Sequence, residues 1–129
     1  PRHATNKSNN SRLAPNQLQI AQLRQKASFL RGRRFTLERI ALGFVPMLAA
    51  SLLERHFRKG GPAAYYLSIP HPKTSRHRYV RKANVDMIRR QTDAWREFSR
   101  AMAEWVRVNG AIERLLRRMG SGRCRKIEL

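Results

Sequence analysis

A seven-residue apolar repeat runs through residues 84–119 and constrains the fold more than any other feature of the chain. Eight of its ten seam positions are apolar, which predicts one long helix that packs along a continuous seam. Asn84 is suited to cap this helix, whose expected length is about 50 Å at 1.5 Å per residue. Asn109 is polar within the seam, and such an asparagine often fixes the register of paired helices. The seam positions are Ile88, Gln91, Trp95, Phe98, Met102, Trp105, Asn109, Ile112, Leu116 and Met119.

The N-terminal third of the chain carries a shorter helical pattern. A stripe of apolar residues at helical spacing predicts a helix from about residue 15 to Leu30. The arginine-rich run at residues 31–34, which contains a glycine, is expected to end this helix. A second helical segment is predicted to begin near Thr36 and to break at Gly43 and Pro46. The stripe consists of Ile20, Leu23, Ala27 and Leu30.

The next segment contains a motif that favours the start of a helix, followed by residues that end one. Ser51 and Glu54 have the spacing of a capping box, which predicts a short third helix through about Arg58. The alternative is one bent helical segment from Met47 onward. The Gly-Gly-Pro run at residues 60–62 is a strong stop for either helix.

Two stretches beyond these glycines have the composition of strands. The first, Tyr65–Ile69, is aromatic and apolar, and the second, Arg76–Arg81, alternates around Tyr79 and Val80. They flank a proline-containing loop, which predicts a β-hairpin at about residues 64–82. Neighbouring residues of a strand point to opposite faces. One of Tyr65 and Tyr66 is therefore expected to pack under the long helix, and the other to stay exposed.

These elements predict a mainly α protein, with an antiparallel helical hairpin as a coiled-coil-like core and a small two-stranded β-hairpin. The first helix would pack along the long C-terminal helix. The seam of residues 88–119 leaves another possibility open, in which the long helix pairs with a partner protein or with a second copy of the chain. Residues 1–14 are expected to form a flexible basic arm, residues 15–119 a single helical domain and residues 120–129 a basic tail.

The charge of the chain indicates its partner. The 129 residues include 28 lysines and arginines against 8 aspartates and glutamates, a formal net charge of +20, and 22 of the cations are arginines. Self-repulsion of this size destabilises a compact chain, which indicates a polyanionic partner. Arginine binds phosphate oxygens in pairs and stacks on rings. Nucleic acid is therefore the predicted partner, with RNA preferred over DNA.

Cations and aromatic rings are interleaved between residues 55 and 82. Single strands and RNA require this combination, because rings stack on bases while arginines hold phosphates. The arginine run at residues 31–34 and the arginine face of the long helix would add phosphate contacts. The predicted nucleic-acid-binding residues are Arg31, Arg33, Arg34, Arg55, Arg58, Lys59, Tyr65, Tyr66, Lys73, Arg76, Arg78, Arg81, Arg107, Arg114, Arg117 and Arg118.

The sequence shows no pattern typical of catalysis or of metal binding. Its acidic residues are scattered singly, and no histidine has a carboxylate at the spacing of a triad or a metal site. Cys124 is the only cysteine, which fits a reducing cytoplasmic setting. We therefore expect no enzymatic activity, no cofactor and no metal. No run of about 18 apolar residues occurs, so no membrane partner is expected.

Several short motifs follow one another between Leu52 and Met119: Leu53-Glu54-Arg55, Gly61-Pro62 with Tyr65-Tyr66-Leu67-Ser68, Arg78-Tyr79-Val80, and the helix after Asn84. In this order they resemble a family of small, basic, uncharacterised bacterial proteins often found near mobile elements. Members of that family have a Gly-Pro-Tyr-Tyr-Tyr-Leu strand before a long C-terminal helix. They usually carry several cysteines just before that strand, where this chain has none, so a zinc role does not carry over. The resemblance implies a helix–hairpin–helix layout and a nucleic-acid setting.

Together, these features predict non-enzymatic RNA binding by a small ribonucleoprotein subunit or a guide-RNA-type accessory factor. Three alternatives stay open. The chain can be a DNA-binding accessory protein of a mobile element, a lineage-specific ribosomal protein, or a helical dimerisation or assembly protein whose charge serves solubility.

Overall fold

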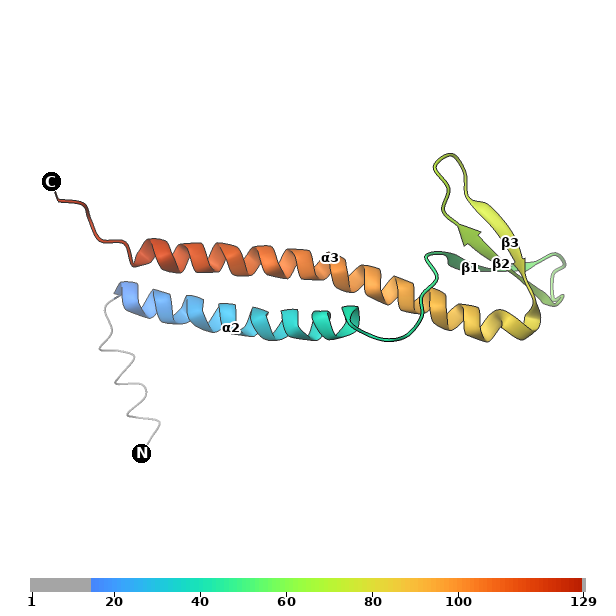
Figure 1. Ribbon diagram of the computed structural model, residues 1–129, viewed down its shortest axis with the longest axis horizontal. Coiled ribbons are helices and arrows are strands. Elements are labelled where there is room, and N and C mark those ends of the chain that lie inside the picture. The colour runs from blue at the N-terminus through green and yellow to red at the C-terminus, as the bar shows by residue number, and fades with distance from the viewer. Residues whose placement is uncertain (1–14, 129) are drawn as a thin grey trace, which may run out of the picture. The chain divides into compact units, whose positions relative to one another are not determined.

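The computed structural model describes residues 15–128. In chain order it contains α2 (Pro15–Ala41), β1 (Ser51–His56), β2 (Ala63–Ile69), β3 (Arg76–Val80), a 3-10 turn (Lys82–Asn84) and α3 (Val85–Gly122) (Figure 1). The flexible arm predicted at residues 1–14 lies outside the described residues. The chain divides into two compact units. The helix-pair unit comprises residues up to Glu38 and from Glu104 onward, and the sheet unit comprises Arg39–Ala103.

The predicted fold class, a mainly α protein with a two-stranded hairpin, is wrong. The strands form a three-stranded antiparallel sheet in the order β1-β2-β3, and the fold combines this sheet with two helices. The additional strand is Ser51–His56, for which both alternatives in the sequence predicted a helix. Leu52 pairs with Leu67 and Glu54 pairs with Tyr65, so the backbone groups of this segment are satisfied by the ladder to β2 rather than by a capped helix.

The Gly-Gly-Pro run at residues 60–62 connects β1 to β2 by a tight turn. Gly60 has a φ of 78°, a conformation that favours glycine because a side chain would clash with the backbone. The amide of Gly61 donates to the carbonyl of Arg58 at 2.9 Å and closes the turn. The same glycines that predicted the end of a helix therefore make a second hairpin possible.

Two predicted elements are confirmed. Strands β2 and β3 pair antiparallel, with Tyr66 opposite Tyr79, where the sequence predicted a hairpin. Helix α3 is continuous over the predicted long helix and ends at Gly122 rather than near Met119.

Helix α2 is one helix, so the predicted stop at residues 31–34 is wrong. Thr36, the predicted cap of a second helix, lies inside α2, and its hydroxyl donates to the carbonyl of Gly32 at 3.3 Å. Arginine is a good helix former, and a single glycine costs only about 1 kcal/mol. The helix continues because Leu37, which is 2% exposed, extends the buried side of Leu23 and Ala27.

In the helix-pair unit, α2 lies antiparallel to the C-terminal part of α3 (Figure 1). Arg33 forms a bidentate ion pair with Glu104, in which Nη2 donates to Oε1 at 2.8 Å. Nearby, the indole of Trp105 donates to Glu38 at 3.0 Å. The Oδ1 atom of the seam residue Asn109 accepts a hydrogen bond from α2 at 3.0 Å. These polar contacts flank a small apolar interface whose buried residues are Leu23, Ala27, Leu37, Val108 and Ile112.

The ion pair across this interface predicts a pH-dependent contribution to stability. The hydrogen bond from Arg33, its largest cause, lowers the pKa of Glu104 below its ordinary value, and the charges of Arg33 and Arg107 act in the same direction against desolvation. A lowered folded-state pKa stabilises the fold above the unfolded value of about 4.3, and this contribution is lost as the pH falls through the folded-state pKa. Glu104→Gln should therefore be less stable than the wild type at neutral pH, with the difference vanishing in acid.

Urea unfolding of both proteins over a pH series measures this difference. Arg33→Gln is the matched control, because Glu104→Gln should have little further effect once its partner is absent. An equal difference between Glu104→Gln and the wild type at every pH would contradict the assignment.

In the sheet unit, the N-terminal part of α3 covers one face of the sheet. The guanidinium of Arg89 lies over the ring of Tyr65, with Cζ 5.7 Å from the ring centroid. The carbonyl of Gln91 accepts a hydrogen bond from the amide of Leu48 at 3.0 Å. Val80 and Val85 are buried at 4% and 6% exposure. Among residues 15–128, no helix has the length and apolar character needed to cross a membrane.

Candidate nucleic-acid interface

The two faces of the sheet have different surroundings. Leu52, Glu54 and Tyr65 line a cavity of about 230 Å³ together with residues of α3, so these side chains lie on the covered face. Because side chains alternate along a strand, the residues between them lie on the opposite, open face. The α3 residues that line the cavity are Arg89, Thr92, Asp93 and Arg96.

The open face carries a cluster that we call the aromatic face: Arg55, Phe57, Tyr66, His77 and Tyr79. Tyr66 is its centre. The rings of Phe57 and Tyr79 approach Tyr66 edge-on, with ring centroids 6.5 Å and 5.7 Å away. The Cζ atom of Arg55 lies 5.2 Å from the centroid of the same ring, a cation–π contact.

A hydrogen bond across the sheet holds the cation of this cluster in place. Nη2 of Arg55 lies 2.8 Å from Nδ1 of His77. A guanidinium can only donate, so Nδ1 of His77 accepts in this bond. The contact with Tyr66 and this bond together fix the Arg55 side chain, which reduces the conformational entropy lost on binding a ligand.

Two rings of the aromatic face are open to solvent. Tyr79 is 61% exposed and Phe57 is 73% exposed. Both rings rest against Tyr66, which is half-buried. Exposed rings held on a sheet beside a fixed cation can stack on unpaired bases, because every base presents a π-face. The chemistry available to this surface is therefore stacking combined with phosphate contacts.

The other predicted cations of the sheet unit lie at the edge of the sheet and in its loops, outside this cluster. Arg76 and Arg78 are exposed on the edge strand β3, and Arg81 follows it. Alternation puts Arg76 and Arg78 on the same side as the buried Val80, whereas His77 and Tyr79 lie on the open face. The remaining predicted residues of the sheet unit are exposed in its two hairpin loops: Arg58, Lys59 and Lys73.

The two tyrosines predicted as binding residues lie on different faces. Tyr65 is covered by Arg89 of α3, and Tyr66 belongs to the aromatic face. The sequence had predicted that one of the two would pack under the long helix, and the contact with Arg89 identifies Tyr65 as that residue. Of these two tyrosines, Tyr66 is therefore the one that can contribute to a binding surface on the open face of the sheet.

The predicted arginines of the helices belong to the helix-pair unit, and some are already paired with carboxylates. Arg33 pairs with Glu104, and Arg117 lies 3.0 Å from Glu113. Arg34 lies 3.7 Å from Glu38 and also donates to α3. The other four are exposed, and none forms an ion pair with another residue in the described part of the chain: Arg31, Arg107, Arg114 and Arg118.

Sequence reasoning missed three residues of the aromatic face: Phe57, His77 and Tyr79. Phe57 and Arg55 could not be placed together with Tyr66, because the segment that carries them was predicted as a helix. Alternation along a strand is enough to put His77 and Tyr79 on one face. What was lacking was the register that sets Tyr79 opposite Tyr66. The signal that could have revealed this arrangement is that Ser51–His56 can pair with the edge of β2 that β3 leaves free.

Comparison with known proteins found no matching family model, no similar curated protein and no similar solved structure. The resemblance to small basic bacterial proteins near mobile elements therefore stays a prediction from the motifs.

Proposed function

We propose that this protein binds single-stranded nucleic acid without catalysing a reaction, and that it prefers RNA to DNA. The observation that carries the proposal is the aromatic face, in which exposed rings and a fixed arginine share the open side of a three-stranded sheet. The function that follows is that of a small ribonucleoprotein subunit or a guide-RNA-type accessory factor. A cytoplasmic setting accords with the single cysteine.

The proposed contacts divide between bases and phosphates. Tyr79 and Phe57 offer the rings on which bases would stack. Exposed cations at the edge and in the loops of the same sheet unit would bind the phosphates of the nucleic acid on either side of the stacked bases. These cations are Arg58, Lys59, Lys73, Arg76, Arg78 and Arg81. Base stacking and charge neutralisation are therefore available within one compact unit.

The same geometry favours single strands over duplexes. In a duplex the bases are stacked on one another and present only their edges in the grooves. The rings of the aromatic face need the flat face of a base, which unpaired loops and single strands provide. RNA is preferred because its unpaired loops and bulges are the sites at which proteins read it by stacking.

Competition binding tests the proposal. The probe is a short fluorescent RNA strand of mixed sequence, bound by the full chain at moderate fixed salt and followed by anisotropy. We expect unlabelled single-stranded RNA to displace the probe best, single-stranded DNA of the same sequence to follow, and duplexes at equal phosphate concentration to be weakest. Duplex DNA that competes as well as the single strands would instead support a DNA-binding accessory protein. A chain with no measurable affinity for any of these would contradict nucleic-acid binding.

A further inference from the structure

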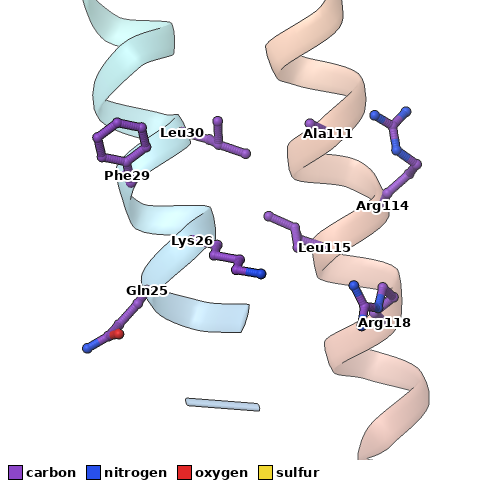
Figure 2. Close-up of a pocket in the computed structure, with 8 residues that line it drawn as sticks. All are labelled: Gln25, Lys26, Phe29, Leu30, Ala111, Arg114, Leu115 and Arg118. Carbon is purple, nitrogen blue, oxygen red and sulfur yellow. The ribbon is translucent and has the colours of Figure 1, made fainter. Parts of the chain in front are cut away.

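The helix-pair unit contains an apolar groove that the proposed function does not use. The groove lies between α2 and the C-terminal part of α3 and has a volume of about 630 Å³. Figure 2 shows Leu30 and Leu115 reaching into the gap between the two helices, with Ala111 above Leu115 on α3. The lining residues are Gln25, Lys26, Phe29, Leu30, Ala111, Arg114, Leu115 and Arg118.

The groove exists because two packed helices bury only the side chains along the line where they touch. Leu23 and Ala27 of α2 and Ile112 of α3 are buried along that line. Phe29 lies beside it and is 77% exposed, and Leu30 and Leu115 are only half-buried. Apolar side chains on one side of the contact between two helices form the surface on which a third helix packs in a helical bundle.

The lining residues of α3 lie on one face of that helix, over a length that a helical ligand can cover. On α3 they occupy positions i, i+3, i+4 and i+7 from Ala111 to Arg118, which is one face of the helix. Seven residues at 1.5 Å each make this face about 11 Å long, or two helical turns. A ligand helix of about three turns with an apolar stripe would cover the groove by the helix-in-groove mode.

The rim of the groove is positive. Lys26, Arg114 and Arg118 line it together with one neutral polar residue, and no aspartate or glutamate among residues 15–128 does. None of these three cations forms an ion pair with another residue of the described ranges. Carboxylates flanking the apolar stripe of a ligand would be complementary to this rim.

We propose that the groove binds an amphipathic acidic helix of a partner protein. A second copy of this chain is a poor occupant, since each copy carries a net charge of +20 and would bring further cations to a positive rim. Nucleic acid is also a poor occupant, because it could use the ring of Phe29 and the cations of the rim but would leave the aliphatic surface of Leu30, Ala111 and Leu115 without a partner. This inference is independent of the proposed function, which concerns the sheet unit.

A synthetic peptide tests the inference. The probe is a fluorescent peptide of three to four turns, with leucines at i, i+3, i+4 and i+7 and glutamates on both flanks. Its scrambled version has the same composition and charge, and a third peptide replaces the glutamates by lysines. With the full chain at moderate salt, we expect the acidic amphipathic peptide to bind at least about tenfold more tightly than its scrambled version, a difference of about 1.4 kcal/mol. The lysine peptide should not bind.

Substitutions in the groove test whether the peptide binds there. Phe29→Ser and the pair Lys26→Glu with Arg118→Glu should each weaken binding about tenfold or more, without loss of helical circular dichroism, because all three side chains are exposed. The matched controls on α2 are Phe35→Ser and Arg24→Glu. Both residues are exposed and neither lines the groove, so both variants should bind the peptide like the wild type.

Four results would overturn the inference. The scrambled peptide could bind as tightly as the patterned one, which would reduce the effect to net charge. The control variants could weaken binding as much as the groove variants. Sedimentation could show a dimer that Phe29→Ser converts to a monomer, which would make a second copy the occupant. The groove variants could weaken binding of the single-stranded RNA probe while leaving peptide binding unchanged, which would assign the groove to nucleic acid.

Discussion

Leu37→Ala is expected to lower the free energy of unfolding of the helix-pair unit by about 2–5 kcal/mol. The substitution removes the most buried leucine of α2, at 2% exposure, and leaves a cavity between the helices. The effect should be large relative to the total, because the unit buries few other apolar side chains and small folds have only a few kcal/mol of net stability. The described apolar residues buried with it in this unit are Leu23, Ala27, Val108 and Ile112.

Urea unfolding followed by tryptophan fluorescence measures this loss. Trp105 bonds to Glu38 in the helix-pair unit, whereas Trp95 belongs to the sheet unit. A Trp95→Phe background therefore makes the fluorescence report on the helix pair alone. Phe35→Ala is the control, because it deletes a larger side chain that is 62% exposed, and it should change stability by no more than about 0.5 kcal/mol. Equal unfolding midpoints for Leu37→Ala and the control would show that α2 does not pack through Leu37.

Tyr79→Ala is expected to weaken the binding of single-stranded RNA about 5- to 150-fold, which corresponds to about 1–3 kcal/mol for one lost base stack. Tyr79 is the most exposed tyrosine of the aromatic face, and its ring is held edge-on against Tyr66 at 5.7 Å. Tyr79→Phe keeps the ring and is the matched control, so its affinity should stay close to that of the wild type. Anisotropy with the RNA probe measures both variants.

The salt dependence separates stacking from phosphate binding. Tyr79→Ala should lower affinity by the same factor at every salt concentration, because the deleted ring is uncharged. Replacing Arg76 and Arg78 by glutamine should instead flatten the dependence of log K on log salt by about 0.7 for each phosphate that the protein no longer neutralises. Unchanged affinity for Tyr79→Ala would remove the aromatic face from the proposal. An unchanged slope for the arginine variant would remove the edge of β3.

The elements that rest on strong local patterns could be predicted from the sequence. Helix α3 follows from an apolar repeat sustained over residues 84–119, and the β2–β3 hairpin follows from two short alternating stretches around a proline-containing loop. Both signals are local, since periodicity and turn residues act within one or two elements.

Other parts of the fold depend on partners that are distant in the sequence. Helix α2 continues through residues 31–34 because Leu37 is buried and Arg33 pairs with Glu104, which lies 71 positions away. Ser51–His56 becomes a strand because β2 has a free edge for it, although its own sequence contains a capping box. A capping box is worth about 1 kcal/mol, which pairing along a whole strand exceeds.

Composition and periodicity are properties of the chain alone, and they are enough to predict the excess of positive charge, the long C-terminal helix and the hairpin of β2 and β3. Which charges are neutralised and which rings meet depends on contacts between distant parts of the chain. Pairing of β1 with β2 brings Arg55 to Tyr66, and pairing of β2 with β3 brings Tyr79 to the same ring. Strand pairing and helix packing join residues that are far apart in the chain, so no local sequence pattern reveals these contacts.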